Sequence, residues 1–150
     1  MLNRESAFRQ IETMLRARAH LVERAEEQLS AARDAAYSLP GMSTEGDRVT
    51  QSRRPDRIGA KVAAVIEAEE QLRTARAWAR LFVEMDQRFP PTGDGPGMIV
   101  ALHYGSGYSL LRIADMLGIT RPTVHKRQQA WLTDAALLAV HHGLIAAPLE

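Results

Sequence analysis

The sequence predicts an all-α protein, in which a long antiparallel helical hairpin is followed by a group of three shorter helices. Three observations support this fold class. The composition is rich in alanine, leucine, arginine and glutamate and poor in aromatic residues, which favours helices. Apolar residues recur at helical spacing over two long stretches of the first 88 residues. Prolines and glycines gather between the periodic stretches, where turns are expected.

The first helix is predicted over residues 2–37. An apolar residue recurs at every seventh position, at Phe8, Leu15, Val22, Leu29 and Ala36. Charged residues of both signs cover the remaining faces, as is usual for solvated surface. The pattern therefore predicts one continuous helix with a coiled-coil-like seam.

Residues 38–57 are predicted to form an irregular loop, because Pro40 and Gly41 end the first helix. The loop is basic through Arg48, Arg53, Arg54 and Arg57. Two interpretations stay open. The loop is either a solvated connector or an arm whose arginines neutralise phosphate charge on a nucleic acid.

A second long helix is predicted from Ile58 to about Arg88. Its apolar seam is formed by Ile58, Val62, Val65, Leu72, Ala79 and Val83. Two amphipathic helices joined by one loop fold back on each other, so residues 1–89 are predicted to form one antiparallel hairpin. Because a hairpin of two helices has little core, its seam is expected to pack against the C-terminal unit, a second copy of the chain or both. A homo-oligomer is therefore expected.

A linker is predicted over residues 90–97, where prolines and glycines concentrate. The apolar run from Met98 to Tyr104 then predicts a short helix, which Gly105 ends. This helix opens a C-terminal domain over residues 98–150.

The stretch from Tyr108 to Trp131 carries the most specific pattern of the chain. Ser109 is predicted to cap a helix with an apolar face formed by Leu110, Ile113, Ala114 and Leu117. Gly118 ends that helix, because glycine enters the left-handed conformation without steric cost. Ile119 is predicted to fill the space beneath this turn.

A second helix is predicted directly after the glycine turn. Thr120 caps it, and Pro122 lies in its first turn, where a missing N–H costs nothing. Val124 continues the apolar face, while cationic and amide side chains occupy the others. Two helices joined by such a turn indicate a helix-turn-helix, so residues 98–150 are predicted to form a tri-helical helix-turn-helix domain. The alternative interpretation is a helical hairpin that does not touch DNA.

A helix-turn-helix places the N-terminal half of its second helix against base edges in the major groove. The predicted base-reading residues are Arg121, Thr123, His125 and Lys126, with Gln129 a little further out. Ser109 and Arg112 start the supporting helix and are predicted to contact phosphates. The complete predicted interface with double-stranded DNA comprises Ser109, Arg112, Thr120, Arg121, Thr123, His125, Lys126, Arg127 and Gln129.

These motifs resemble a known family. The segment YGSGYSLLRIADMLGITRPTVHKR, residues 104–127, is similar to the region-four helix-turn-helix of sigma factors. The layout before it, with YSLPGM at residues 37–42 and a second helix led by Asp56, resembles the small phage-encoded transcriptional regulators of the RinA/ArpU late-gene activator type. Arg112 departs from related motifs, which often carry a glutamate near the start of the first helix.

The resemblance implies a regulator of late phage operons that binds DNA and has no catalytic activity. It further implies a location in the host bacterial cytoplasm and nucleoid. Activation of transcription would add the host RNA polymerase as a partner.

Several function classes are excluded by composition. The chain has no cysteine, so it holds neither a disulfide nor a thiolate metal site. Its serine, histidine and acidic residues form no catalytic motif, and no cofactor or metal is expected. No apolar run approaches the length of a membrane span, and the charged N-terminus is unlike a secretory signal. The net charge is only +1, so affinity for nucleic acid must come from local clustering of cations.

Two other functions stay open. A small DNA-packaging subunit of a phage terminase also combines a helix-turn-helix with a coiled coil, although its DNA-binding unit usually comes first. A helical adaptor would use the same fold only for protein contacts. Such an adaptor would show no salt-dependent binding of DNA.

Overall fold

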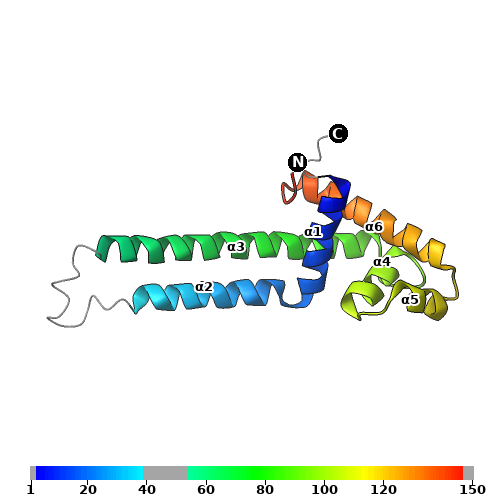
Figure 1. The fold of residues 1–150 in the computed structure, drawn as a ribbon, viewed down its shortest axis with the longest axis horizontal. Helices are drawn as coiled ribbons and strands as arrows, with labels where there is room; N and C mark the ends of the chain where they lie inside the picture. The colour runs from blue at the N-terminus through cyan, green and yellow to red at the C-terminus, as the bar shows by residue number, and fades with distance from the viewer. Residues whose placement is uncertain (1–2, 39–53, 147–150) are drawn as a thin grey trace. The chain divides into compact units, whose positions relative to one another are not determined.

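The computed structural model describes residues 3–38 and 54–146, and every regular element in these residues is helical (Figure 1). The predicted all-α class is therefore confirmed. The elements are α1 (Arg4–Ala17), the 3₁₀ turn η1 (Arg18–His20), α2 (Leu21–Tyr37), α3 (Arg54–Arg88), α4 (Pro96–Val100), the π-helical turn η4 (Ala101–Gly105), α5 (Leu110–Leu117) and α6 (Arg121–His141).

The single helix predicted over residues 2–37 is wrong. The chain leaves the α-helix after Ala17 and passes through η1 before α2 begins at Leu21. Arg18 lies at this break, and its guanidinium binds the Asp86 carboxylate at 2.6 Å and lies over the Phe82 ring, 5.5 Å from its centroid. These contacts with α3 hold Arg18 at the break. In the sequence, Arg18 interrupts a second apolar series at seven-residue spacing, formed by Ile11, Ala25 and Ala32, which was predicted to lie on one continuous helix.

The chain forms two compact units, and α3 contributes to both. The first unit comprises residues 1–19 and 77–150, and the second comprises residues 20–76. This division differs from the predicted boundary at residue 89, because the apolar end of α3 is buried in the first unit. The predicted linker over residues 90–97 also differs at its end, since α4 already begins at Pro96.

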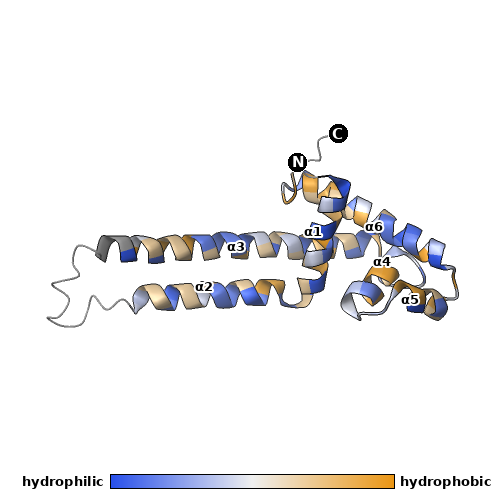
Figure 2. Ribbon diagram, in the orientation of Figure 1, coloured by the Kyte–Doolittle hydropathy of each residue, from blue (hydrophilic) through white to orange (hydrophobic). Residues whose placement is uncertain are grey.

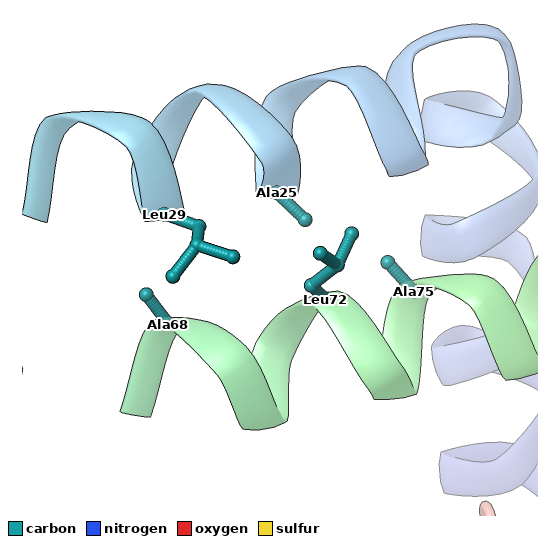
Figure 3. Packing of buried hydrophobic residues seen from close by; sticks show 5 residues of the cluster. All are labelled: Ala25, Leu29, Ala68, Leu72 and Ala75. Carbon is teal, nitrogen blue, oxygen red and sulfur yellow. The ribbon is translucent and has the colours of Figure 1, made fainter. Parts of the chain in front are cut away.

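In the second unit, α2 and α3 pack side by side through a small apolar core. Its buried members are Ala25, Leu29, Ala68, Leu72 and Ala75 (Figure 3). The two helices run antiparallel, as shown by ion pairs between Arg33 and Glu69 at 3.5 Å and between Glu26 and Arg76 at 3.6 Å. Because these pairs are exposed, each contributes at most about 1 kcal/mol, and burial of the alanines and leucines holds the helices together.

The predicted seam of α3 is only partly correct. Leu72 is buried as expected, but the side chains of Ile58, Val62 and Val83 are 46%, 50% and 52% exposed. Hydrophobic and hydrophilic residues alternate along both α2 and α3, as Figure 2 shows. The buried stripe instead follows Ala68, Leu72 and Ala75, and its two small alanines permit close approach of the two helices.

The first unit has an aromatic centre built from α3 and α6. Trp78, Phe82 and Trp131 are at most 2% exposed. The ring centroids of Trp78 and Phe82 lie 5.9 Å apart, and those of Phe82 and Trp131 lie 6.5 Å apart in a stacked arrangement. Three large rings that are almost wholly removed from water supply much of the apolar burial of this unit.

Helix α1 also belongs to the first unit. Ala7, Phe8, Ile11 and Leu15 are buried on one of its faces, and α1 contacts α6 and η4. Asn3 caps the helix by accepting a hydrogen bond from the Ser6 N–H at 2.8 Å. The heptad positions of α1 thus pack within the unit itself.

Two further predictions concern the N-terminal end of α3 and the segment before it. The basic loop predicted over residues 38–57 lies mainly outside the described residues. Helix α3 begins at Arg54, before the predicted start at Ile58, so Asp56 lies within the helix and does not lead it. Among the residues that the structure describes, no helix combines the length and the apolar character needed to cross a lipid bilayer.

Candidate nucleic-acid interface

Helices α5 and α6 and the turn between them form the candidate interface. Ser109 caps α5, because its Oγ accepts a hydrogen bond from the Arg112 N–H at 3.2 Å. Gly118 ends α5 in the left-handed conformation, with φ at +67°. Thr120 caps α6 by accepting from the Thr123 N–H at 3.4 Å. All three predicted end signals are confirmed, and they fix the length of both helices.

A small apolar core holds α5 against α6 and the preceding helix. Ile99, Ile113, Ala114 and Val124 are at most 5% exposed, and Leu102, Leu110, Leu117 and Ile119 pack around them. The predicted apolar faces of α5 and α6 are therefore correct. Ala114 lies at this contact, where a larger side chain would separate the two helices.

The short helix predicted from Met98 to Tyr104 has a more complex form. The chain forms α4 up to Val100 and then widens into the π-helical turn η4, which ends at Gly105. A π turn carries one more residue than an α turn, which changes the direction in which the next side chains point. Here Tyr104 is buried, at 8% exposure.

The residues predicted to contact DNA lie mainly on the solvent side of this unit. Those exposed are Ser109, Arg112, Thr120, Arg121, His125 and Lys126. Thr123 and Gln129 are half-buried, and the Thr123 hydroxyl lies 2.8 Å from that of Thr120. Positions 121, 125, 126 and 129 follow the helical repeat, so they share one broad face of α6.

The charge of this stretch suits a polyanion. Residues 108–131 contain four basic residues and one acidic residue, whereas the whole chain carries a net charge of +1. The basic residues are Arg112, Arg121, Lys126 and Arg127, and the acidic residue is Asp115. Arg112, Arg121 and Lys126 are exposed and Arg127 is half-buried, so three of these cations are accessible, as phosphate binding requires.

Arg127 makes contacts within the protein that the sequence did not indicate. Its Nη1 donates to the Asp94 carbonyl oxygen at 2.7 Å and lies 3.5 Å from the Asp94 carboxylate. The side chain is 34% exposed. Arg127 therefore ties the loop before α4 to α6.

Gln128 was not among the predicted site residues, yet it is buried at 6% exposure and donates from Nε2 to the Tyr104 hydroxyl at 2.7 Å. The signal was present in the sequence. Gln128 lies four residues after Val124 and three before Trp131, which places it on the apolar face of α6.

Within residues 3–38 and 54–146, no group of three or more His, Cys, Asp or Glu side chains is placed to hold a metal ion. Comparison of the chain with protein-family models, with curated proteins and with solved structures finds no match.

Proposed function

We propose that the protein is a sequence-specific DNA-binding regulator of transcription, without catalytic activity, in which α5 and α6 act as a helix-turn-helix. The observation that carries this proposal is the pairing of two capped helices with a left-handed glycine turn, together with the exposed cationic face of α6. The face is rigidly supported, because α6 is anchored by Val124 and Trp131 in the core.

The proposed roles follow from position along the two helices. Arg121, His125 and Lys126 lie on the N-terminal half of α6 and face base edges, with Gln129 beyond them. Arg112 lies in the first turn of α5, where its cation and the positive end of the helix dipole together suit a phosphate. Ser109 and Thr120 maintain the caps that present these groups.

The biological setting is proposed from the sequence resemblance. Similarity to region four of sigma factors and to the RinA/ArpU late-gene activators supports regulation of late phage genes, in the cytoplasm of a bacterial host. Such a regulator would also contact the host RNA polymerase.

Selection of bound fragments from a random duplex library, repeated at two salt concentrations, tests this function. We expect enrichment of a short motif by the parent protein, with affinity that falls as salt rises. Arg121→Ala is expected to lose about 1–3 kcal/mol of discrimination at one position, because a bidentate contact with guanine is removed. Arg112→Ala is expected to weaken binding to all duplexes alike and to reduce the salt dependence.

Arg80→Ala is the matched control, because Arg80 is an exposed arginine on α3 and belongs neither to α5 nor to α6. It should bind and select as the parent does. Recovery of DNA without enrichment would favour the terminase-like packaging subunit, and no recovery at low salt would favour the protein adaptor. If Arg121→Ala and Arg112→Ala both behaved as the parent, the proposed roles would be wrong.

We further propose that two copies associate through α3. The predicted seam from Phe8 to Ala36 is not available for this purpose, because Phe8, Leu15 and Leu29 are buried within the chain. An exposed stripe remains at Ile58, Val62 and Ile66, spaced four residues apart and 46–53% exposed, with Lys61 the one charged residue from 58 to 66. Such a stripe is self-complementary across a two-fold axis, and a dimer would read two half-sites.

Ile66→Glu is expected to weaken this association by at least about tenfold, because a carboxylate would be desolvated at the contact. Sedimentation equilibrium at micromolar protein measures the effect. Leu137→Glu is the control, since Leu137 is 65% exposed but lies on α6 and not on α3. A parent that is monomeric at these concentrations, or equal loss in both variants, would contradict the dimer.

A further inference from the structure

The first unit contains a buried hydrogen bond that joins α6 to η4. Gln128 is the one buried polar or charged residue of the described chain, and its Nε2 lies 2.7 Å from the hydroxyl oxygen of Tyr104. Both residues are less than 10% exposed. The surrounding core positions of α6 are apolar, so an amide here needs a physical explanation.

Net stability does not provide that explanation. A buried amide must recover in the protein the hydrogen bonds that it loses from water, so the pair contributes little beyond what two apolar side chains of similar size would contribute. Hydrogen bonds differ from apolar contacts in direction, because they weaken steeply when distance or angle changes. A single buried polar pair therefore selects one arrangement among several with similar packing.

The arrangement that this pair selects is the rotation of α6 about its own axis. Successive residues of an α-helix are separated by about 100° around that axis. The direction in which Gln128 points inward therefore determines the direction in which its neighbours His125, Lys126 and Gln129 point outward. Tyr104 lies in the π-helical turn, where the extra residue sets the position of the hydroxyl that receives the bond.

We propose that the Gln128–Tyr104 hydrogen bond is a positioning pair, which fixes the rotational setting of α6 and thereby its discrimination between DNA sequences. The second half of this inference rests on the proposed DNA-binding function, whereas the rotational setting does not.

The surroundings of Tyr104 disfavour ionisation of its phenol. Burial is the largest effect and raises the pKa of the Tyr104 phenol well above its ordinary value. The hydrogen bond from Gln128 lowers this pKa, the Glu12 carboxylate raises it, and the charge of Arg16 lowers it. The guanidinium of Arg16 lies 5.4 Å from the centroid of the Tyr104 ring. The oxygen of this phenol accepts the Gln128 hydrogen bond.

The test removes both partners at once, in Tyr104→Phe/Gln128→Leu, so that no buried polar group is left unpaired. Because the parent has no cysteine, spin labels can be attached at Asp115→Cys on α5 and Ala130→Cys on α6, both of which are exposed. We expect the distance distribution between the labels to shift or broaden when the pair is removed, in a protein that still unfolds cooperatively. An unchanged distribution would overturn the proposal.

DNA selection provides the second measurement. In the unlabelled double variant, we expect the ratio of specific to non-specific affinity to fall by about tenfold or more, which is the effect of one or more mismatched base pairs in the binding site. The salt dependence of binding should not change. Leu138→Met is the control, because it changes a buried apolar residue of α6 with little change in volume and should alter neither readout.

The experiments distinguish failure of the proposed DNA-binding function from failure of the proposed role of the Gln128–Tyr104 pair. A parent that enriches no motif would refute the proposed function, and the label distances would still decide whether the pair sets the rotation of α6. A parent that enriches a motif with the same discrimination as the double variant would refute the link between the pair and specificity.

Discussion

Replacement of Trp131 by alanine is expected to lower the free energy of unfolding by about 3–5 kcal/mol. Trp131 is 1% exposed and stacks on Phe82, with ring centroids 6.5 Å apart, so the substitution removes a large buried ring and leaves a cavity beside a second aromatic residue. For a domain of ordinary stability, this loss is a large part of the total free energy of unfolding. Urea denaturation followed by far-ultraviolet circular dichroism measures it without dependence on tryptophan fluorescence.

The matched control is Leu137→Ala on the same helix. Leu137 is 65% exposed, so its truncation should change the free energy of unfolding by less than about 0.5 kcal/mol apart from helix propensity. Equal stability of Trp131→Ala and the parent would mean that α6 does not pack on α3 as described. A large loss in Leu137→Ala would instead indicate that this part of α6 is covered by another surface.

Gly97→Ala is expected to have the second large effect. Gly97 is buried in the first turn of α4, and a Cβ built there would overlap the carbonyl oxygen of Phe89 and lie 2.7 Å from that of Pro90. These are backbone atoms, so the clash cannot be relieved by a change of rotamer. We expect destabilisation of about 3 kcal/mol, at the upper end of the range for overpacking, measured as a lower midpoint of urea denaturation.

Gly95→Ala serves as the control two residues earlier. Gly95 has φ at −76°, and a Cβ there would meet no atom within 4 Å. About 0.5–1 kcal/mol should be lost, because alanine is a poorer N-cap residue than glycine. If Gly97→Ala were as stable as Gly95→Ala, the close approach between α4 and the Phe89–Pro90 backbone would be wrong.

The local structure of the candidate interface was predictable from the sequence. Ser109, Gly118 and Thr120 act within one turn of their own positions, and the structure places each at the helix end that it was expected to define. The apolar faces of α5 and α6 were equally predictable, because the 3.6-residue repeat depends only on sequence spacing. Ile113 and Val124 are accordingly fully buried.

The path of the N-terminal segment was not predictable in this way. Heptad spacing from Phe8 to Ala36 is the same whether the helix continues or breaks. The one interruption of the seam, at Arg18, does not by itself indicate that the helix ends there. The break depends on contacts between residues that are distant in the sequence. One example is the ion pair between Arg18 and Asp86, two residues that are 68 positions apart. For the same reason, the sequence did not show that Phe8 and Ile11 would be buried in the first unit.

Sequence alone determined the helical class, the ends of α5 and α6 and the concentration of cations between Tyr108 and Trp131, because each of these depends on neighbours within a few positions. Only the tertiary structure decided which apolar stripe of α3 is buried, and that Arg127 binds Asp94 while Gln128 binds Tyr104. The two side chains are adjacent on α6 and both polar, and their different surroundings arise from segments more than 20 residues away. Burial and partner choice are properties of the packed chain, so they follow from the fold and cannot be read from local spacing.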